Sequence, residues 1–125
     1  MLSDSDVIAT VAVKDTKTAA QFYEGKLGLE RQESPEPTIL LYKGGSGQLL
    51  VYPSQFSGTN EATSVTWIVG DVDREVQALK EKGVTFERYE MPNVTHEGDV
   101  HVMGKRRSAW FKDPDGNIHA LASRD

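Results

Sequence analysis

The sequence predicts an α+β fold made of two copies of a β-α-β-β-β module. Residues 11–32 and 67–88 share one order of features, which is a β-branched apolar run, an Asp, an amphipathic helix, a glycine and a further strand. Two short apolar runs joined by turn residues follow each copy. Because repeats indicate repeated structural units, we expect a single domain over residues 1–125. Module one covers about 7–57 and module two about 63–123.

Each module is expected to begin with a strand and a capped helix. The runs 7–13 and 65–69 are rich in Val and Ile and are followed by Asp15 and Asp71, which stand 56 residues apart. An Asp at a helix start can accept hydrogen bonds from the first free backbone N–H groups. The apolar residues that follow recur at spacings of three and four, which predicts one buried helical stripe. Gly28 and Gly83 then suit the helix ends, and strands are expected at 29–33 and 84–89.

Two hairpins complete the modules. In module one, strands 38–43 and 48–52 are joined across "GGSG", and in module two, strands 107–112 and 118–122 are joined across "DPDGN". Pro presets φ for a turn, Gly accepts positive φ, and Asp and Asn bond their own backbone. With the helices packed on one face of each sheet, the other face is free to curve around something.

Composition narrows the function classes. A formal net charge of −5 argues against nucleic-acid binding, which needs a basic face. No apolar run approaches the roughly 20 residues that span a bilayer, so no membrane partner is expected. The start has acidic residues rather than the basic flank of a signal peptide. The chain has no cysteine, which excludes disulfides and thiolate chemistry, and a cytoplasmic location is the default expectation.

Two motifs within this plan resemble the vicinal oxygen chelate superfamily, which includes glyoxalase I, extradiol dioxygenases and bleomycin-resistance proteins. They are "VKDTKTAAQFYEGKLGLE" near the start and "AWFKDPDGNIHALA" near the end. The resemblance implies that the sheets of the two modules form a cup-shaped curved sheet with the helices on its outer face. It also implies a homodimer, because a second subunit often completes the cup in this family.

The resemblance further implies where a metal ion would be held in the cup. In each module, one family ligand stands seven residues before the helix-capping Asp. A third ligand stands four residues after the glycine of the last turn. Here those positions are Ile8, Ser64 and Ala120. A divalent cation needs several convergent oxygen or nitrogen donors. We therefore expect the standard metal site to be absent, and no cofactor is expected.

The alternation of side chains along strands sorts the cup-facing residues from the others. If position 120 faces the cup, then His119 and Leu121 face the helices, and Val65 and Trp67 belong to the core. The resemblance places Trp110 inward, which leaves a mostly apolar cup with a few polar groups; Trp110 could also simply fill the cup as core. The candidate ligand-binding residues are Trp110, Ser108, Ser64, Thr66, Thr10, Tyr42 and Tyr52.

The stretch 91–105 is expected to be an irregular, solvated lid between the strands. Its candidate functional side chains are His96, Glu97 and His101. Histidine can act as a general base or a metal ligand, but no helical spacing fixes partners for these residues. His119 is expected to be a partly buried strand residue with a satisfied N–H. No catalytic residue is assigned.

Three functions remain open. The first is a protein that binds or sequesters an apolar or aromatic small molecule without chemistry, as bleomycin-resistance proteins do with a drug. The second is a metal-independent isomerase or lyase with a base from the lid. The third is a glyoxalase-type metal enzyme with relocated ligands.

Overall fold

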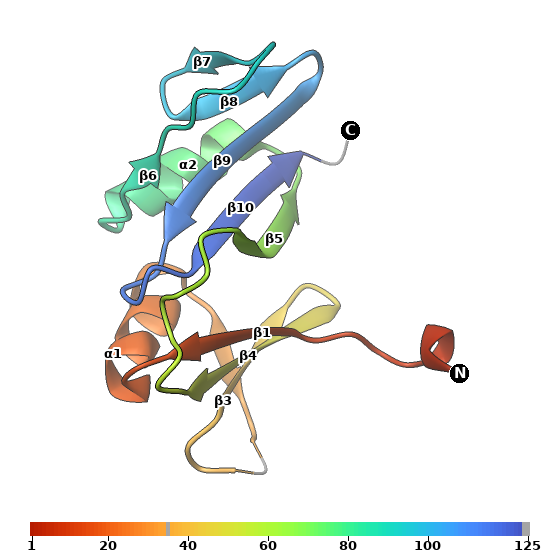
Figure 1. Cartoon of the computed structure of the whole chain (residues 1–125), viewed down its shortest axis with the longest axis vertical. Coiled ribbons are helices and arrows are strands. Elements are labelled where there is room, and N and C mark those ends of the chain that lie inside the picture. Colours follow the sequence, from red (N-terminus) through yellow and green to blue (C-terminus); the bar gives the residue numbers. More distant parts are fainter. Residues whose placement is uncertain (35, 124–125) are drawn as a thin grey trace.

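The computed structural model describes residues 1–34 and 36–123 and confirms the α+β fold (Figure 1). A short 3-10 helix, η1 (Leu2–Asp4), precedes module one. The elements of module one are β1 (Ala9–Val13), α1 (Thr16–Ala20), the π-helix η2 (Gln21–Lys26), β2 (Glu30–Gln32), β3 (Leu40–Gly44) and β4 (Gly47–Pro53). Module two consists of β5 (Thr63–Val69), α2 (Val72–Glu81), β6 (Phe86–Glu87), β7 (Thr95–Glu97), β8 (Val100–Met103), β9 (Arg106–Lys112) and β10 (Ile118–Ser123).

The two sheets repeat one topology. The first has the strand order β1-β4-β3-β2 and the second β5-β10-β9-β8-β7. In both, the first strand of the module pairs in parallel with the last, and the other pairings are antiparallel. The repeat seen in the sequence therefore corresponds to a repeat of strand connections.

The predicted helix caps are present. The carboxylate of Asp15 accepts a hydrogen bond from the backbone of Lys17, and that of Asp71 accepts one from Arg74. Gly28 and Gly83 have φ of +70° and +93°, the left-handed region that glycine enters without steric cost. The helix of module one differs from expectation because α1 passes directly into the π-helix η2.

The predicted irregular lid is wrong, because residues 95–103 form the hairpin β7–β8. The strand expected at 84–89 is reduced to β6, which pairs with Trp110 and Phe111 of β9. The chain then leaves the sheet, and β8 takes over the same edge of β9, with His101 opposite Ser108. The second strand of the module is thus split in two, with β7 folded back on its later half. Pairing with β9 explains why residues 95–103 form regular strands although their composition suggested a loop.

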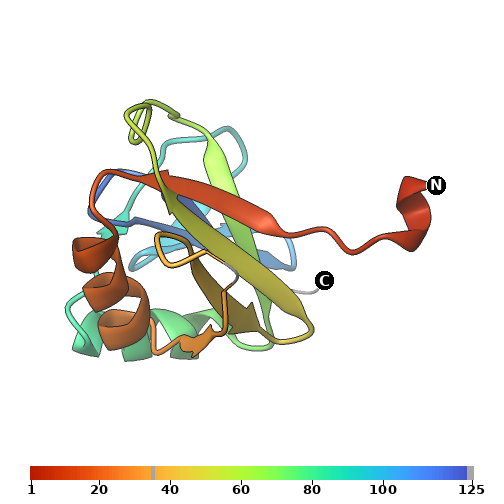
Figure 2. The same cartoon turned by 90° about the horizontal axis from the view of Figure 1, so that it is seen from below.

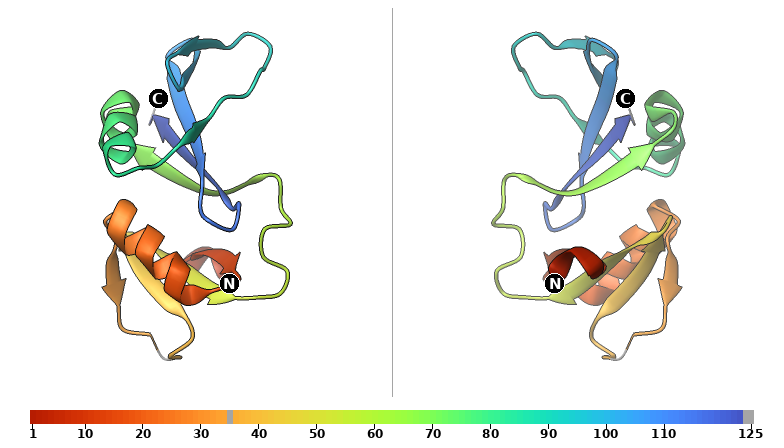
Figure 3. Two further views of the ribbon diagram at one scale, coloured as in Figure 1. Left: turned by 90° about the vertical axis from the view of Figure 1, so that its left-hand side faces the viewer. Right: turned by 90° about the vertical axis from the view of Figure 1, so that its right-hand side faces the viewer.

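Both helices lie on the same side of the molecule (Figure 2), and the linker between the modules runs along the opposite side (Figure 3). The main core lies between the sheets and the helices and includes Val11, Val13 and Val65. Leu121 belongs to this core, whereas Ala120 and Ala122 are buried outside it, as the alternation predicted. We call the sheet faces turned away from the helices the open face. Of the helices in the described part of the chain, none has the length and apolar character that a membrane span requires.

The turn between β9 and β10 fastens the two modules together. Asp113 is buried and accepts hydrogen bonds from the backbone of Asp115 and Asn117. The side-chain amide of Asn117 donates to the carbonyl oxygen of Ala12 at 2.8 Å, and Asp115 accepts from the backbone of Lys14. The residues of this turn that bond to module one must therefore keep fixed places in the chain. This requirement explains why so many turn-forming residues follow one another here.

Beneath this turn, His119 is completely buried, so the expectation of partial burial is wrong. Its Nδ1 accepts from the indole N–H of Trp67 at 3.0 Å, which leaves the proton on Nε2, 2.9 Å from the hydroxyl of Tyr23. That hydroxyl donates to Asp113 at 2.7 Å. Trp67 itself is only half-buried, at the margin of the core. The network joins the helix of module one to the last hairpin of module two.

Candidate functional site

The open face of module two carries a row of side chains that crosses five of the six strands of its sheet. Residues opposite one another in a sheet share a face, and the pairing aligns Ile68, Ala122, Ser108, His101 and His96 in that order. Two of these, His96 and His101, belong to the stretch expected to be a lid. The fold therefore places the lid histidines on the same surface as Ser108.

A second row lies beside the first. Thr66 stands opposite Ala120, which stands opposite Trp110. The neighbours of Trp110 in its strand, Ala109 and Phe111, are core residues, so the indole lies on the open face, where it is half-buried. Its Nε1 donates to the hydroxyl of Thr63 at 3.2 Å.

Four rings cluster where the two rows meet. The ring of His101 meets that of Trp110 edge to face at a centroid distance of 4.7 Å, and that of His96 at 4.6 Å. Tyr89 meets Trp110 edge to face at 5.5 Å. Such edge-to-face pairs are favourable because the positive ring edge meets the negative face of its neighbour. We call Tyr89, His96, His101 and Trp110 the aromatic cluster.

The two histidines of this cluster hold the backbone of one residue, Tyr89. Nε2 of His101 accepts from the backbone N–H of Tyr89 at 2.9 Å, and Nε2 of His96 lies 3.1 Å from the carbonyl oxygen of Tyr89. A carbonyl only accepts, so His96 carries its proton on Nε2, whereas neutral His101 carries it on Nδ1. The histidines thus replace the sheet pairing that the chain gives up where it leaves β9.

Two polar atoms of the aromatic cluster are buried without a hydrogen-bond partner within the described chain. They are Nδ1 of His101 and the hydroxyl of Tyr89. Burial lowers the pKa of His101, and a charge on nearby His96 lowers it further, so the imidazole stays neutral at neutral pH. A buried polar atom without a hydrogen bond lowers the stability of the fold, so its presence in a folded protein needs an explanation.

A cleft lies beside the linker at the boundary of the modules. It is lined by Thr10 of β1, Tyr52 of β4 and Ser64 of β5, together with Phe56 and Asn60 of the linker. Three predicted residues therefore meet here rather than beside Trp110. The side chain of Phe56 is 70% exposed. This aromatic residue in a polar linker was a signal that the sequence analysis did not use, and Tyr89 was also missed.

Tyr42 does not belong to the open face, so its assignment to the cup is wrong. It is completely buried on the helix side of its sheet, where its ring stacks on that of Tyr23 at 5.9 Å. Its hydroxyl donates to Glu24 at 2.8 Å, and burial followed by this contact raises the pKa of Tyr42. The residue stabilises the core.

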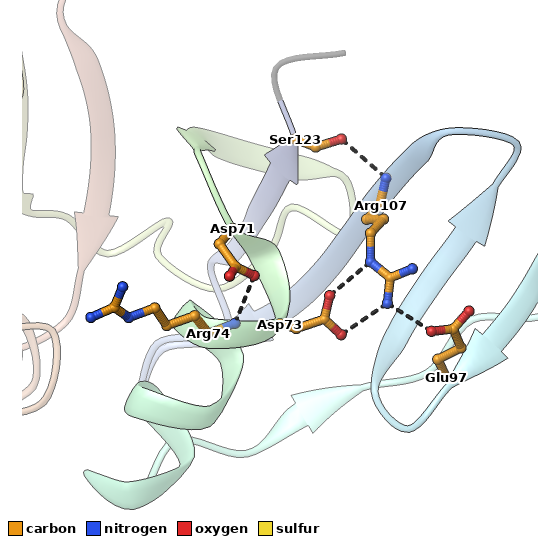
Figure 4. A network of polar contacts seen from close by, with 6 residues as sticks. All are labelled: Asp71, Asp73, Arg74, Glu97, Arg107 and Ser123. Atoms are coloured by element: carbon orange, nitrogen blue, oxygen red, sulfur yellow. Dashed lines mark hydrogen bonds and ion pairs between the residues drawn. The ribbon is translucent and has the colours of Figure 1, made fainter.

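Glu97 lies outside the aromatic cluster, because its carboxylate meets the guanidinium of Arg107 (Figure 4), which corrects its assignment to a solvated lid. Its neighbour His96 faces the cluster, and alternation along β7 turns Glu97 to the other face. There it accepts a hydrogen bond from the guanidinium of Arg107 at 2.9 Å. Arg107 also binds Asp73 of α2 through two hydrogen bonds of 2.7 and 2.9 Å. Glu97 thus helps to fasten the hairpin to α2.

The positions that would hold a metal ion do not fit one. Ile8 and Ala120 have no donor atom, and the hydroxyl of Ser64 accepts from the side chain of Asn60 at 3.2 Å. The buried methyl group of Ala120 stands between Thr66 and Trp110. Across the described residues, no group of three or more His, Asp or Glu side chains is arranged to hold a metal ion.

Comparisons with known proteins agree with this architecture. The model of the glyoxalase/bleomycin resistance protein/dioxygenase superfamily matches residues 6–121. Among curated proteins, none matches the chain.

Solved structures similar to this chain cover nearly all of it. A member of the same superfamily from Sphaerobacter thermophilus DSM 20745 is 26% identical with a TM-score of 0.66, over 95% of this chain and 96% of that one. Lactoylglutathione lyase from Agrobacterium tumefaciens is 20% identical with a TM-score of 0.69, over 96% and 94%. The fosfomycin resistance protein FosX from Mesorhizobium loti is 13% identical with a TM-score of 0.68, over 100% and 95%. The last two likenesses concern the fold alone.

Proposed function

Because the chain belongs to the glyoxalase/bleomycin resistance protein/dioxygenase superfamily, we propose that it binds a small apolar or aromatic molecule on the open face of module two, without a metal ion. The observation that carries the proposal is the aromatic cluster, which contains two buried polar atoms without hydrogen-bond partners among the described residues. Ligand sites are mostly apolar surfaces with a few polar groups. The indole of Trp110 offers the apolar contact, and a ligand that displaces the groups covering Nδ1 of His101 and the hydroxyl of Tyr89 would place an oxygen where these buried atoms lack a partner among the described residues.

The donor set supports binding without a metal ion. Replacement of the three ligand positions by Ile8, Ser64 and Ala120 leaves at most one hydroxyl where several donors are needed. We expect no Zn, Ni, Mn or Fe to copurify with the protein. Elemental analysis that finds about one metal ion per chain after dialysis contradicts this part of the proposal and favours a metal enzyme with relocated ligands.

The contacts of the histidines favour binding over chemistry. A general base needs a free nitrogen within reach of a substrate proton. Nε2 of His101 is occupied by the backbone of Tyr89, and its Nδ1 carries the proton. Nε2 of His96 holds the carbonyl of the same residue. An isomerase or lyase that takes its base from these two residues would first have to release the backbone of Tyr89.

A homodimer is part of the proposal. The arm before β1 projects from the body of the chain (Figure 2), and its residues Leu2 and Val7 are 84% and 89% exposed. Exposed apolar side chains of this kind suit a contact with a second subunit. Light scattering at micromolar concentration tests this directly, and a monomer mass contradicts it.

The experiment for the binding function is a thermal-shift screen of small apolar and aromatic compounds. A compound that binds only the folded state raises the Tm. For a compound found in this way, Trp110→Ala is expected to weaken binding about tenfold or more, because the indole supplies a large contact area in addition to an aromatic pair. The matched control is Phe56→Ala, which removes an exposed ring outside the cluster. Loss of binding in Phe56→Ala but not in Trp110→Ala would show that the site is the linker cleft. If Trp110→Ala instead destabilises the fold and leaves the affinity unchanged, Trp110 is a core residue.

A further inference from the structure

A separate pocket lies on the helix side of the molecule, away from the aromatic cluster. Its walls come from both modules, with Leu29 after η2 on one side and Leu79 of α2 on the other. Its floor includes Trp67 of β5 and Phe111 of β9. It has a volume of about 190 Å³. For comparison, an apolar cavity of about 150 Å³ in another protein holds one benzene molecule.

The lining of this helix-side pocket is apolar except at one point. The indole N–H of Trp67 is turned to Nδ1 of His119, so the ring presents carbon atoms to the pocket. Leu29, Leu79 and Val69 are each only half-buried, although they pack against the core. The pocket therefore leaves apolar surface in contact with water that a ring of suitable size would cover, which is favourable in proportion to the area removed from water.

The single charged group of the lining is Glu75 of α2. It stands one helical turn before Leu79, so the two side chains lie on the same face of the helix. No hydrogen bond or ion pair holds its carboxylate within the described chain, in contrast to Asp73, which binds Arg107. An apolar pocket with one unpaired carboxylate at its rim is complementary to an apolar ring that carries a cation.

The π-helix η2 contributes to the shape of the pocket. The backbone N–H of Leu27 bonds the carbonyl of Phe22, five residues back, which widens the helix just before this wall. Phe22 and Tyr23, which are adjacent in sequence, are both buried in this helix. Leu27 and Leu29 then follow directly into the lining of the pocket.

We propose that this helix-side pocket binds a primary amine with one aromatic ring, with the ring over Trp67 and Phe111 and the ammonium group at Glu75. The site is distinct from the open face and does not depend on the function proposed for it. A ligand of about nine non-hydrogen atoms is expected to bind with a Kd on the order of 1 mM.

The test uses 2-phenylethylamine, which is protonated at neutral pH, and 2-phenylethanol as its neutral counterpart. The background is Trp110→Phe, which makes Trp67 the sole tryptophan and its fluorescence the readout. We expect a saturable change with the amine and about two- to fivefold weaker binding in Glu75→Gln, the range for a partly exposed ion pair. Affinity for the alcohol is expected to be the same in both proteins.

Two controls keep the proposal open to refutation. Val69→Phe fills the pocket and is expected to abolish binding of both probes. If this variant fails to fold, the comparison of the Glu75 protein with Glu75→Gln still tests the site. Glu81→Gln removes a carboxylate of the same helix that does not line the pocket, and it is expected to change nothing. Absence of saturable binding up to 50 times the expected Kd, on the order of 50 mM, overturns the site. Equal affinities for the amine with and without the Glu75 carboxylate overturn the ammonium assignment.

Discussion

The hydroxyl oxygen of Tyr23 lies 2.9 Å from Nε2 of His119, across the boundary between the two modules. The hydrogen bonds that flank this contact determine which atom carries the proton in each bond of the network. Trp67 donates to His119, His119 donates to Tyr23, and Tyr23 donates to Asp113. Burial, followed by the charge of Asp113, raises the pKa of Tyr23, so the hydroxyl keeps its proton at all ordinary pH values. The two modules are therefore held together by a fully paired buried network.

Tyr23→Phe is expected to lower the free energy of unfolding by about 3 kcal/mol, since it leaves buried Nε2 of His119 without a partner among the described residues and removes one of the donors to Asp113. Urea denaturation followed by circular dichroism measures the change. The matched control is Tyr52→Phe, because Tyr52 is 37% exposed and its hydroxyl has no hydrogen-bond partner among the residues that the structure describes. A change within about 0.5 kcal/mol is expected there. Equal losses in the two variants would show that the network does not stabilise the fold.

Stability is expected to fall as the pH drops from about 6.5. Burial lowers the pKa of His119 to about 4 in the folded protein, whereas an unfolded histidine titrates near 6.5. Between these values the unfolded chain binds the proton and the folded chain does not, so acid favours unfolding. From pH 6.5 to 5 the loss from this residue amounts to about 2 kcal/mol.

His119→Gln isolates that contribution, because all other titrating groups stay in place. The urea midpoint of the wild type is expected to move more between pH 6.5 and 5 than that of the variant. Above pH 7 the two proteins are expected to have the same dependence on pH, since histidine is neutral there in both states. Parallel curves throughout would mean that His119 titrates normally in the folded protein.

Gly58→Ala is expected to be strongly destabilising. Gly58 has φ of +75°, and a Cβ atom there would overlap the backbone carbonyl oxygen of Asp115 in the turn that fastens the modules. Gly98→Ala is the matched control, with φ of +65° and no atom within 4 Å of an added Cβ. The positive φ alone costs about 1–2 kcal/mol in each variant. A further loss of at least about 2 kcal/mol is expected only at Gly58, from overpacking, and chemical denaturation of both variants measures the difference.

Arg107→Ala is expected to loosen the β7–β8 hairpin, because Arg107 connects Glu97 of the hairpin to Asp73 of α2 (Figure 4). These are partly exposed ion pairs, so the loss of global stability is limited to about 1 kcal/mol. Hydrogen exchange at the backbone of Val100 and Val102 is expected to accelerate. Arg106→Ala is the control, since Arg106 is exposed and makes no ion pair within the described chain. Unchanged exchange in Arg107→Ala would show that strand pairing alone holds the hairpin.

The sequence by itself determined the two modules, their helix caps and their main turns. These features depend on local contacts, such as Asp15 and Asp71 with the next helical turn and the glycines at helix ends. A residue that satisfies the backbone within a few positions can be read without knowledge of the rest of the chain. The alternation along β10 was also readable, because the turn before it set the register.

Only the tertiary structure decided which of the predicted site residues meet. Strands β3 and β4 carry leucines on both faces, for example Leu40 and Leu41, so alternation could not show that Tyr42 faces the helices. The hairpin β7–β8 forms because β8 pairs with β9. The polar local sequence does not predict this pairing. That pairing brought His101 against Trp110 and turned Glu97 away. Contacts between distant residues depend on strand register and on which face packs against the helices, and both are set by the whole fold rather than by local sequence.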